Sequence, residues 1–283
     1  MLLGMARALR QLRGRHDVIL ANQSMTALPV AAAGGRARKH YYIQADESEY
    51  YAFEKGARAR AAQAIAMLSY ELPLRQVANG PLFMGYKRMR PSTWIPPGID
   101  LDIFHRRAAA PDFRPGDSIT IGMIGRREPA KGCMYVLEAF RALALRDASV
   151  RLKVAYGNLP QGWAHERAEV VVPHNDAELA AYYRSVDILV APGIVQLGSA
   201  HYPVLEAMAC GTPLITTGYI PATEENAWIV PVKDSDAIAR AVQDVRAMRS
   251  VDRLHKLDRA HEAVRGFAWP AVAQRFLTEF SRP

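Results

Sequence analysis

From residue 119 onward, short runs of β-branched and apolar residues alternate with segments of helical spacing. The runs predict strands at 119–124, 150–155, 170–172, 188–191, 213–216 and 228–230, and the spacing predicts helices at 136–145, 176–185, 204–209 and 234–248. Strands that alternate with helices in this way build a parallel sheet with helices on both faces. We therefore predict an α/β fold whose C-terminal part is a doubly wound, Rossmann-like sheet.

The first part of the chain carries fewer such signals. It predicts strands at 17–20 and 40–44 and helices at 61–69 and 80–88, which is too little for a complete second sheet. Prolines without a clear period between residues 90 and 116 are typical of a linker. We predict a partial N-terminal α/β domain at 1–92, a linker at 93–116 and a second domain at 117–262.

The last segment, 263–283, is predicted to contain a helix that packs back toward the N-terminal domain. Pro270 suits the first turn of a helix. Helical spacing then places four apolar side chains on one face, namely Val272, Phe276, Leu277 and Phe280.

The positive charge of the chain is concentrated at its start. Residues 1–90 hold 14 Lys and Arg against 6 Asp and Glu, which accounts for the whole net charge of +8. Such a basic surface attracts anionic lipids, nucleic acids or acidic glycans, although a merely solubilising surface fits the composition as well. No helix-turn-helix, zinc or aromatic-platform signature accompanies the charge, so we predict no nucleic-acid partner.

The two cysteines, Cys133 and Cys210, have no Cys or His neighbour at metal-ligand spacing. We therefore expect no disulfide and no metal site, which fits the reducing cytoplasm. No run of eighteen apolar residues occurs and no secretion signal is recognisable, so we expect no membrane-spanning helix.

A glycine turn follows the predicted strand at 119–124. It begins at Gly125, carries Arg126 and Lys131 and leads at Gly132 into a predicted helix. Backbone amides, a helix dipole and two cations would together hold a diphosphate. Taken alone, the same residues also fit ordinary exposed cations at the end of a strand.

Two further segments, Ser185–Pro192 and Tyr202–Pro213, make the pattern more specific. Together with 95–100, 125–132 and 267–269 they resemble the donor site of glycosyltransferase family 4, whose retaining enzymes have the two-domain GT-B fold. The resemblance implies transfer of a hexose or deoxyhexose from a nucleoside diphosphate sugar to a glycan or lipid-linked acceptor, with no metal or other cofactor. It also implies roles in polysaccharide or cell-envelope biosynthesis. We expect a cytoplasmic protein whose basic first third either holds it at the inner face of an anionic membrane or positions an acidic acceptor.

The resemblance carries roles over to individual positions. Arg126 and Lys131 match the pair that neutralises the diphosphate, and Glu206 matches the carboxylate that binds the nucleotide ribose. The remaining donor-side candidates are Gly125, His174, Gln196, Gly198, Ser199, Ala200, His201 and Tyr202. For Glu206 a helix-surface role, and for His174 and Tyr202 a structural role, remain alternatives.

The chain departs from the family pattern in the donor loop. Gly198 stands where the family has the first of two glutamates, and the loop is about one residue longer than usual. Gln196 could offer its amide to a sugar hydroxyl instead. The departure leaves two readings: a different donor sugar, or a catalytically silent nucleotide-binding or partner subunit.

The segment Tyr41–Tyr51 resembles the cleft of rhamnan-type family 4 transferases, with Ala45 in place of an acid. It makes Gln44, Asp46, Glu47 and Glu49 candidates for the acceptor side. The first strands and the glycine-rich loop of that domain have no counterpart, so the N-terminal domain is expected to be truncated. An exposed sheet edge would then need covering, for example by a second copy. A sugar-nucleotide epimerase shares the GT-B fold and is a further alternative.

Overall fold

The computed structural model describes residues 2–114 and 116–282, so Met1, Pro115 of the predicted linker and Pro283 lie outside the described residues. The chain divides into two compact units. The first unit comprises residues 1–97 and 270–283, and the second unit comprises residues 98–269.

The second unit is built on a parallel six-stranded sheet in the order β10-β9-β8-β5-β6-β7. Its strands are β5 (Ile119–Ile124), β6 (Val150–Ala155), β7 (Ala168–Val171), β8 (Ile188–Ala191), β9 (Leu214–Thr216) and β10 (Trp228–Ile229). Its helices are η2 (Pro129–Lys131), α5 (Cys133–Arg146), α6 (Asp176–Ser185), α7 (Tyr202–Ala209), α8 (Ser235–Ala247) and α9 (Ser250–Arg265).

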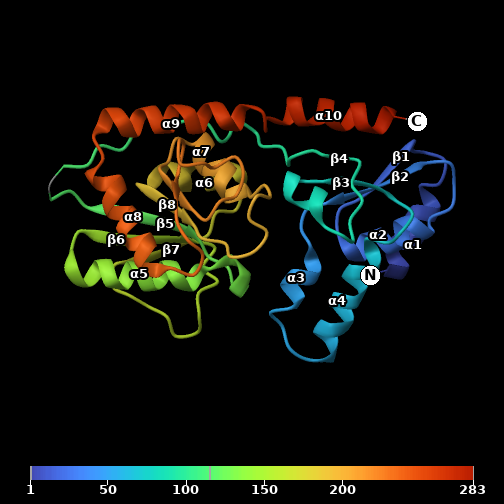
Figure 1. The fold of residues 1–283 in the computed structure, drawn as a ribbon, viewed down its shortest axis with the longest axis horizontal. Coiled ribbons are helices and arrows are strands. Elements are labelled where there is room, and N and C mark those ends of the chain that lie inside the picture. Colours follow the sequence, from blue (N-terminus) through green and yellow to red (C-terminus); the bar gives the residue numbers. More distant parts are fainter. Residues whose placement is uncertain (1, 115, 283) are drawn as a thin grey trace. The chain divides into compact units, whose positions relative to one another are not determined.

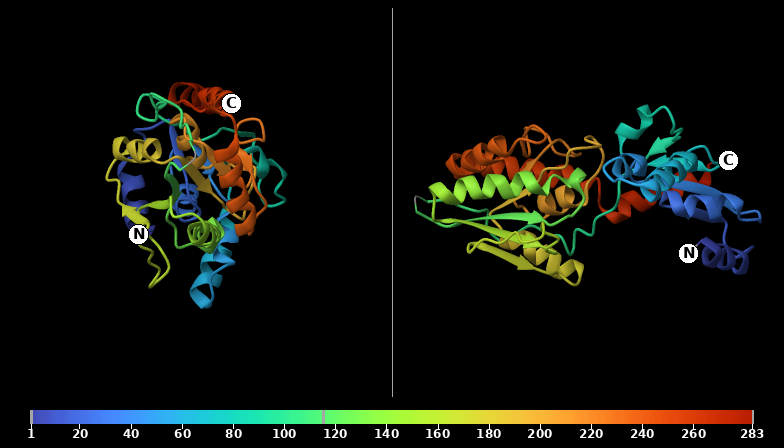
Figure 2. Two further views of the ribbon diagram at one scale, coloured as in Figure 1. Left: turned by 90° about the vertical axis from the view of Figure 1, so that its left-hand side faces the viewer. Right: turned by 90° about the horizontal axis from the view of Figure 1, so that it is seen from below.

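Two apolar clusters hold this sheet between its helices. Side chains of α5 and α8 pack on one face, around Ile121 and Phe140. Those of α6, α7 and α9 pack on the other face, around Tyr183 and Leu205. Figure 1 shows the sheet between these two layers of helices. In the left view of Figure 2, α5 is seen almost down its own axis. This is the doubly wound α/β architecture predicted from the alternating pattern.

The strongest sequence signals were accurate in the second unit. The strands at 119–124, 150–155 and 188–191 and the helix at 176–185 have the predicted limits. Helix α9 was not predicted, because its sequence is largely polar and only a narrow stripe, including Leu257 and Val264, is buried. Such a stripe gives little periodic signal.

Residues 98–114, expected to form a linker, pack within the second unit. The backbone of Ile99 donates to Phe267 O at 2.8 Å and accepts from Trp269 N at 3.1 Å. Ile99 and Phe104 are buried in the core. An added Cβ on Gly98 would lie 2.3 Å from the Trp269 ring, so only glycine fits there. The prolines stiffen a segment that covers the unit.

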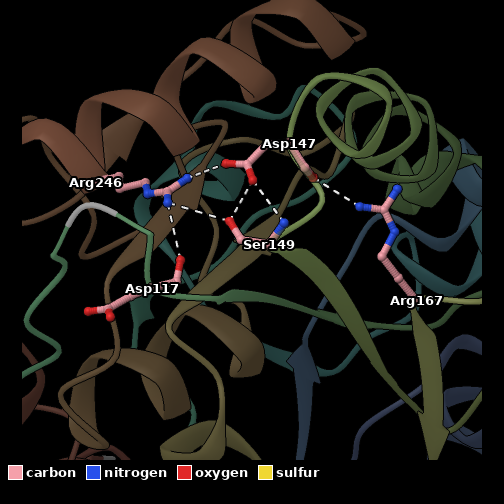
Figure 3. A network of polar contacts seen from close by, with 5 residues as sticks. All are labelled: Asp117, Asp147, Ser149, Arg167 and Arg246. Atoms are coloured by element: carbon pink, nitrogen blue, oxygen red, sulfur yellow. Dashed lines mark hydrogen bonds and ion pairs between the residues drawn. The ribbon is translucent and has the colours of Figure 1, made fainter.

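A polar network ties α5, α8 and the start of β6 together (Figure 3). The carboxylate of Asp147 accepts from the Ser149 amide at 2.8 Å, from the Ser149 hydroxyl at 2.6 Å and from Arg246 at 2.5 Å. Arg167 donates to the Asp147 carbonyl at 2.9 Å. The bonds from Ser149 and Arg246 lower the pKa of the Asp147 carboxyl to about 2, so it stays ionised at physiological pH.

The first unit contains a parallel four-stranded sheet in the order β1-β2-β3-β4. Its strands are β1 (Val18–Ala21), β2 (Arg38–Ile43), β3 (Arg75–Ala78) and β4 (Thr93–Trp94). Its helices are α1 (Leu2–Gln11), α2 (Ser24–Ala32), α3 (Glu47–Tyr51), α4 (Ala57–Ser69), η1 (Pro81–Gly85) and α10 (Trp269–Ser281), whose first residue belongs to the second unit.

Only two strands of this sheet were predicted. Strand β3 carries Arg75 and Gln76 in a run of four residues, and β4 has two residues, so neither gives a clear alternation. The helix predicted at 80–88 was wrong. Pro81–Gly85 forms one 3₁₀ turn that begins after Gly80, and the chain then continues toward β4. The helix-favouring residues in this segment are too few to form a stable α-helix, because the first helical turn is costly to form.

Helix α10 covers the face of the first unit's sheet that carries His40 and Tyr42. The Phe280 ring lies 4.8 Å from His40 and the Phe276 ring 5.2 Å from Tyr42. Val272 is fully buried against this face. Leu277, predicted to share that face, is instead 59% exposed, because the buried stripe is narrower than the one drawn from the sequence.

No helix in residues 2–114 and 116–282 is long and apolar enough to cross a bilayer. Within the same residues, no three His, Cys, Asp or Glu side chains come together as a metal site. Cys133 and Cys210 are buried, free thiols.

Candidate functional site

The second unit contains a cavity of about 550 Å³ at the carboxyl ends of its strands. It lies beyond the end of β5, the strand from which the sheet proceeds to β6 on one side and to β8 on the other. Such a switch point is where parallel α/β sheets bind ligands. The polar lining consists of Asp100, Arg126, Tyr156, Asn158, Asp176, Tyr183, Tyr202 and Glu206.

Arg126 joins this cavity to a smaller pocket. The Arg126 side chain is exposed and lines both spaces, whereas Lys131 and His201 line only the smaller one. Burial and the charge of Arg126 lower the pKa of Lys131. The two predicted phosphate cations therefore lie at one pocket, where an anion would relieve their mutual repulsion.

Glycines shape the turn that carries these cations. An added Cβ on Gly125 would lie 1.7 Å from Gly157 O, and one on Gly132 would lie 2.1 Å from Pro192 O. Gly132 also has a φ of +69°, where side chains are strained. The turn therefore brings the backbone of three loops close together, directly before the N-terminus of α5.

Glu206 lies at the wall of the large cavity, on α7, and is only 8% exposed. The fully buried Tyr183 hydroxyl donates to its Oε2 at 2.6 Å. Burial raises the pKa of Glu206 to about 7, and the negative charge of Asp176 adds to the rise. A carboxylate held in this way is not a helix-surface acid.

The donor loop before α7 is fixed by its own backbone. Gly198 has a φ of +89° and donates to Gly218 O at 2.9 Å, while Ala200 bridges to Ile220. The Ser199 hydroxyl donates to the Gln196 carbonyl at 2.8 Å, and Gln196 itself has a φ of +57°. A glutamate would be strained at Gly198, so this loop takes a path suited to glycine.

His201 lines the smaller pocket, whereas Tyr202 lines the large cavity. The His201 ring stacks on Tyr219 with 4.6 Å between ring centroids, and burial lowers the pKa of His201 well below its usual value. His201 is therefore neutral at physiological pH. Tyr202 is 42% exposed and lines the large cavity at the first turn of α7.

His174 does not line the cavity. Its amide donates to Glu178 Oε2 at 2.9 Å in the capping turn of α6, and Asp176 reaches the cavity instead. The sequence reasoning missed Asp176 and also Tyr183, Tyr156 and Asn158. The sequence Tyr-Gly-Asn directly after the predicted strand at 150–155 was the signal available, because glycine and asparagine favour turns. In the structure both Tyr156 and Asn158 have positive φ values.

The acceptor-side candidates lie in the first unit, where each of the four has a hydrogen-bond partner within the protein. Asp46 caps α3 by accepting from the Ser48 amide at 3.0 Å. Glu47 accepts from the Ser24 hydroxyl at 2.5 Å.

Glu49, on α3, accepts from the Tyr86 hydroxyl at 2.8 Å. Gln44 is exposed and donates to Asn22 O at 3.2 Å. The acids of this segment thus stabilise the first unit itself.

The chain is similar in sequence to known transferases. Residues 118–247 match the family model "Glycosyl transferases group 1". The D-inositol 3-phosphate glycosyltransferase of Saccharomonospora viridis is 29% identical over 210 residues, which cover 65% of this chain and 48% of that protein. The enzyme of the same name from Corynebacterium glutamicum is 28% identical over 218 residues, 66% of this chain and 50% of that protein. The chain spans about half the length of these curated relatives.

Solved structures show the same fold. Sucrose-phosphate synthase from Thermosynechococcus elongatus has a TM-score of 0.78 at 18% identity, over 99% of this chain and 77% of that chain. Anabaena HepE, solved in complex with UDP and glucose, has a TM-score of 0.78 at 14% identity, over 99% and 81%. The predicted GT-B-like α/β fold is confirmed.

Proposed function

We propose that the second unit binds a nucleoside diphosphate sugar and that the protein is a retaining glycosyltransferase. The observation that carries this proposal is the cavity at the carboxyl edge of the sheet, which is lined by both Arg126 and the buried Glu206. The similarity of residues 118–247 to group 1 glycosyl transferases supports it. The substrate class is a hexose or deoxyhexose on a nucleoside diphosphate.

In the proposed complex, the diphosphate lies against Arg126 and Lys131, near the first turn of α7. Two cations stabilise the charge that develops on a departing diphosphate. The ribose hydroxyls donate to Glu206, since an ionised carboxylate accepts two such bonds. The nucleoside then occupies the larger cavity beside Tyr156 and Tyr202.

The proposed reaction is a same-face displacement at the anomeric carbon. The bond from that carbon to the diphosphate oxygen breaks as the bond to the acceptor oxygen forms, and the acceptor proton passes to the leaving diphosphate. Arg126 and Lys131 lower the barrier because the negative charge on the leaving group is larger in the transition state than in the bound donor.

The acceptor is proposed to be a glycan or a lipid-linked sugar, as in cell-envelope polysaccharide synthesis. The excess of Lys and Arg in residues 1–90 supports an acidic acceptor, or peripheral contact with an anionic membrane on its cytoplasmic side. Gln44 is the acceptor-side candidate that remains exposed.

The test is release of nucleoside diphosphate from UDP-glucose, GDP-mannose and ADP-glucose by the purified chain, with and without a lipid-linked acceptor. We expect release from at least one donor, and a loss of about 100-fold in kcat/KM for Arg126→Ala. Arg127→Ala is the matched control, because Arg127 is an exposed neighbour that lines neither space. Tight binding of every donor without any release would instead support a silent nucleotide-binding subunit.

A further inference from the structure

Among the described residues, one buried hydroxyl holds the carboxylate of Glu206. Tyr183 lies on α6 and is 0% exposed, and its hydroxyl donates to Glu206 Oε2 at 2.6 Å across the boundary between α6 and α7. The Tyr183 ring is fixed by Phe104, 6.4 Å away, and by Tyr182, 5.4 Å away between centroids. The hydroxyl therefore has one position and points at one carboxylate oxygen.

Asp176 acts on the same carboxylate with the opposite sign. It is an exposed residue in the first turn of α6 and lines the cavity together with Glu206. Its negative charge favours protonation of Glu206, whereas the Tyr183 hydrogen bond and the Arg126 charge favour ionisation. Tyr156 and Tyr202 also line the cavity, and the pKa of each is raised, so both stay neutral. Asp100 and Asn158 are the remaining polar residues of the lining.

We propose that Tyr183 is a positioning residue that holds the Glu206 carboxylate toward the nucleoside end of the cavity, and that Tyr183 and Asp176 together set the pH range in which the nucleotide sugar binds. The proposal rests on the nucleotide-binding function proposed above. It adds a proton-dependent step: a ribose hydroxyl has to donate to Glu206, and a protonated carboxyl group is the weaker acceptor.

The direction of the pH dependence follows from these contacts. The pKa of Glu206 is raised to about 7, so the ionised form gains population as pH rises through neutrality. Affinity for the donor then rises over the same range. Loss of the Tyr183 hydroxyl moves the midpoint to higher pH, because the ionised form loses a donor. Loss of the Asp176 charge moves the midpoint to lower pH, because the ionised form loses a repulsive neighbour.

The experiment is calorimetric titration of the intact chain with UDP-glucose from pH 5.5 to 8.5. This probe is suitable because its diphosphate carries a substituent at each end and does not titrate in this range. For Tyr183→Phe we expect affinity at pH 7.5 about tenfold weaker and a midpoint about one pH unit higher. For Asp176→Asn, on the exposed end of a helix, we expect a lower midpoint.

Two controls separate positioning from packing. Tyr182→Phe removes the neighbouring buried hydroxyl, which donates to the Met123 carbonyl at 2.8 Å and does not touch Glu206. We expect its pH profile to match that of the unsubstituted chain. Glu206→Gln should bind weakly at every pH and lose the midpoint, which assigns the titration to this carboxylate.

The outcomes distinguish the two proposals. If UDP-glucose and the other donors fail to bind at any pH, the proposed function is wrong. If UDP-glucose binds with the same midpoint in Tyr183→Phe and Asp176→Asn as in the unsubstituted chain, the role of Tyr183 is refuted. Should Tyr183→Phe fold poorly, the direction of the Asp176→Asn shift decides, and an unchanged or higher midpoint overturns the proposal.

Discussion

At the scale of single residues, two buried ionisable side chains, Glu206 and Arg253, differ in how many protein partners they have. Glu206 is buried at a cavity and has one buried partner, which fits a group kept for a ligand. Arg253 is also buried, at 1% exposure, but it has protein partners in several directions. The first arrangement leaves capacity for binding, while the second is structural.

Arg253 lies on α9 and supports the segment before β5. It donates to Met248 O at 2.7 Å and to Pro111 O at 3.0 Å, and its guanidinium lies 4.7 Å from the centre of the Phe113 ring. Arg253→Met removes these bonds and leaves the part-buried carbonyls of Met248 and Pro111 without this donor.

We expect this substitution to lower the unfolding free energy of the second unit by about 3 kcal/mol, measured by urea denaturation. Arg259→Met is the matched control on the same helix. The Arg259 side chain is 63% exposed and lies 3.7 Å from Glu225, so a change of less than about 1 kcal/mol is expected. Equal losses for the two variants would show that Arg253 is not a structural anchor.

At the scale of elements, the attachment of α10 to the first unit's sheet depends on a buried histidine. His40 is 0% exposed and packs against Phe280, and neither ring nitrogen has a hydrogen-bond partner among the described residues. Burial and the charge of Arg75 lower the pKa of His40, while Glu279 opposes this. The imidazole is neutral in the folded unit.

The sign of the pH effect follows from that lowered pKa. Below the ordinary pKa of 6.5 the unfolded chain takes up a proton at His40 that the folded unit resists, so stability decreases as pH falls. We expect the thermal midpoint of the first unit to drop between pH 7.5 and pH 5.5. His40→Leu should reduce that drop, whereas His16→Leu, at an exposed position, should leave it unchanged. An undiminished drop in His40→Leu would contradict the assignment.

At the scale of the whole molecule, the elements that could be predicted from the sequence are those with a regular pattern of apolar residues. The strands with the predicted limits are those whose apolar runs are bounded by turns, as in Ile119–Ile124. The Arg126 turn was predicted because strand, glycine and helix signals coincide there, whereas the role of Glu206 was inferred from the family resemblance.

Other features could not be read in the same way. Strand β4 is too short to have a period, and α9 buries too narrow a stripe. The partnership of Tyr183 with Glu206 joins residues 23 positions apart and depends on how α6 packs against α7. Tertiary packing, which local patterns do not encode, determines that contact. The turn at Tyr156 and Asn158 has positive φ values at non-glycine residues, and its Gly-Asn pair was the signal that the sequence offered.

The central claim is that the second unit binds a nucleoside diphosphate through the Arg126 turn. Calorimetric titration of the intact chain with UDP, GDP and ADP at pH 7.5 tests it most directly. We predict a dissociation constant between about 1 μM and 1 mM for at least one of them, weakened at least tenfold in Arg126→Ala and unchanged in Arg127→Ala. Absence of binding for all three nucleotides, or equal affinity in both variants, would contradict the account.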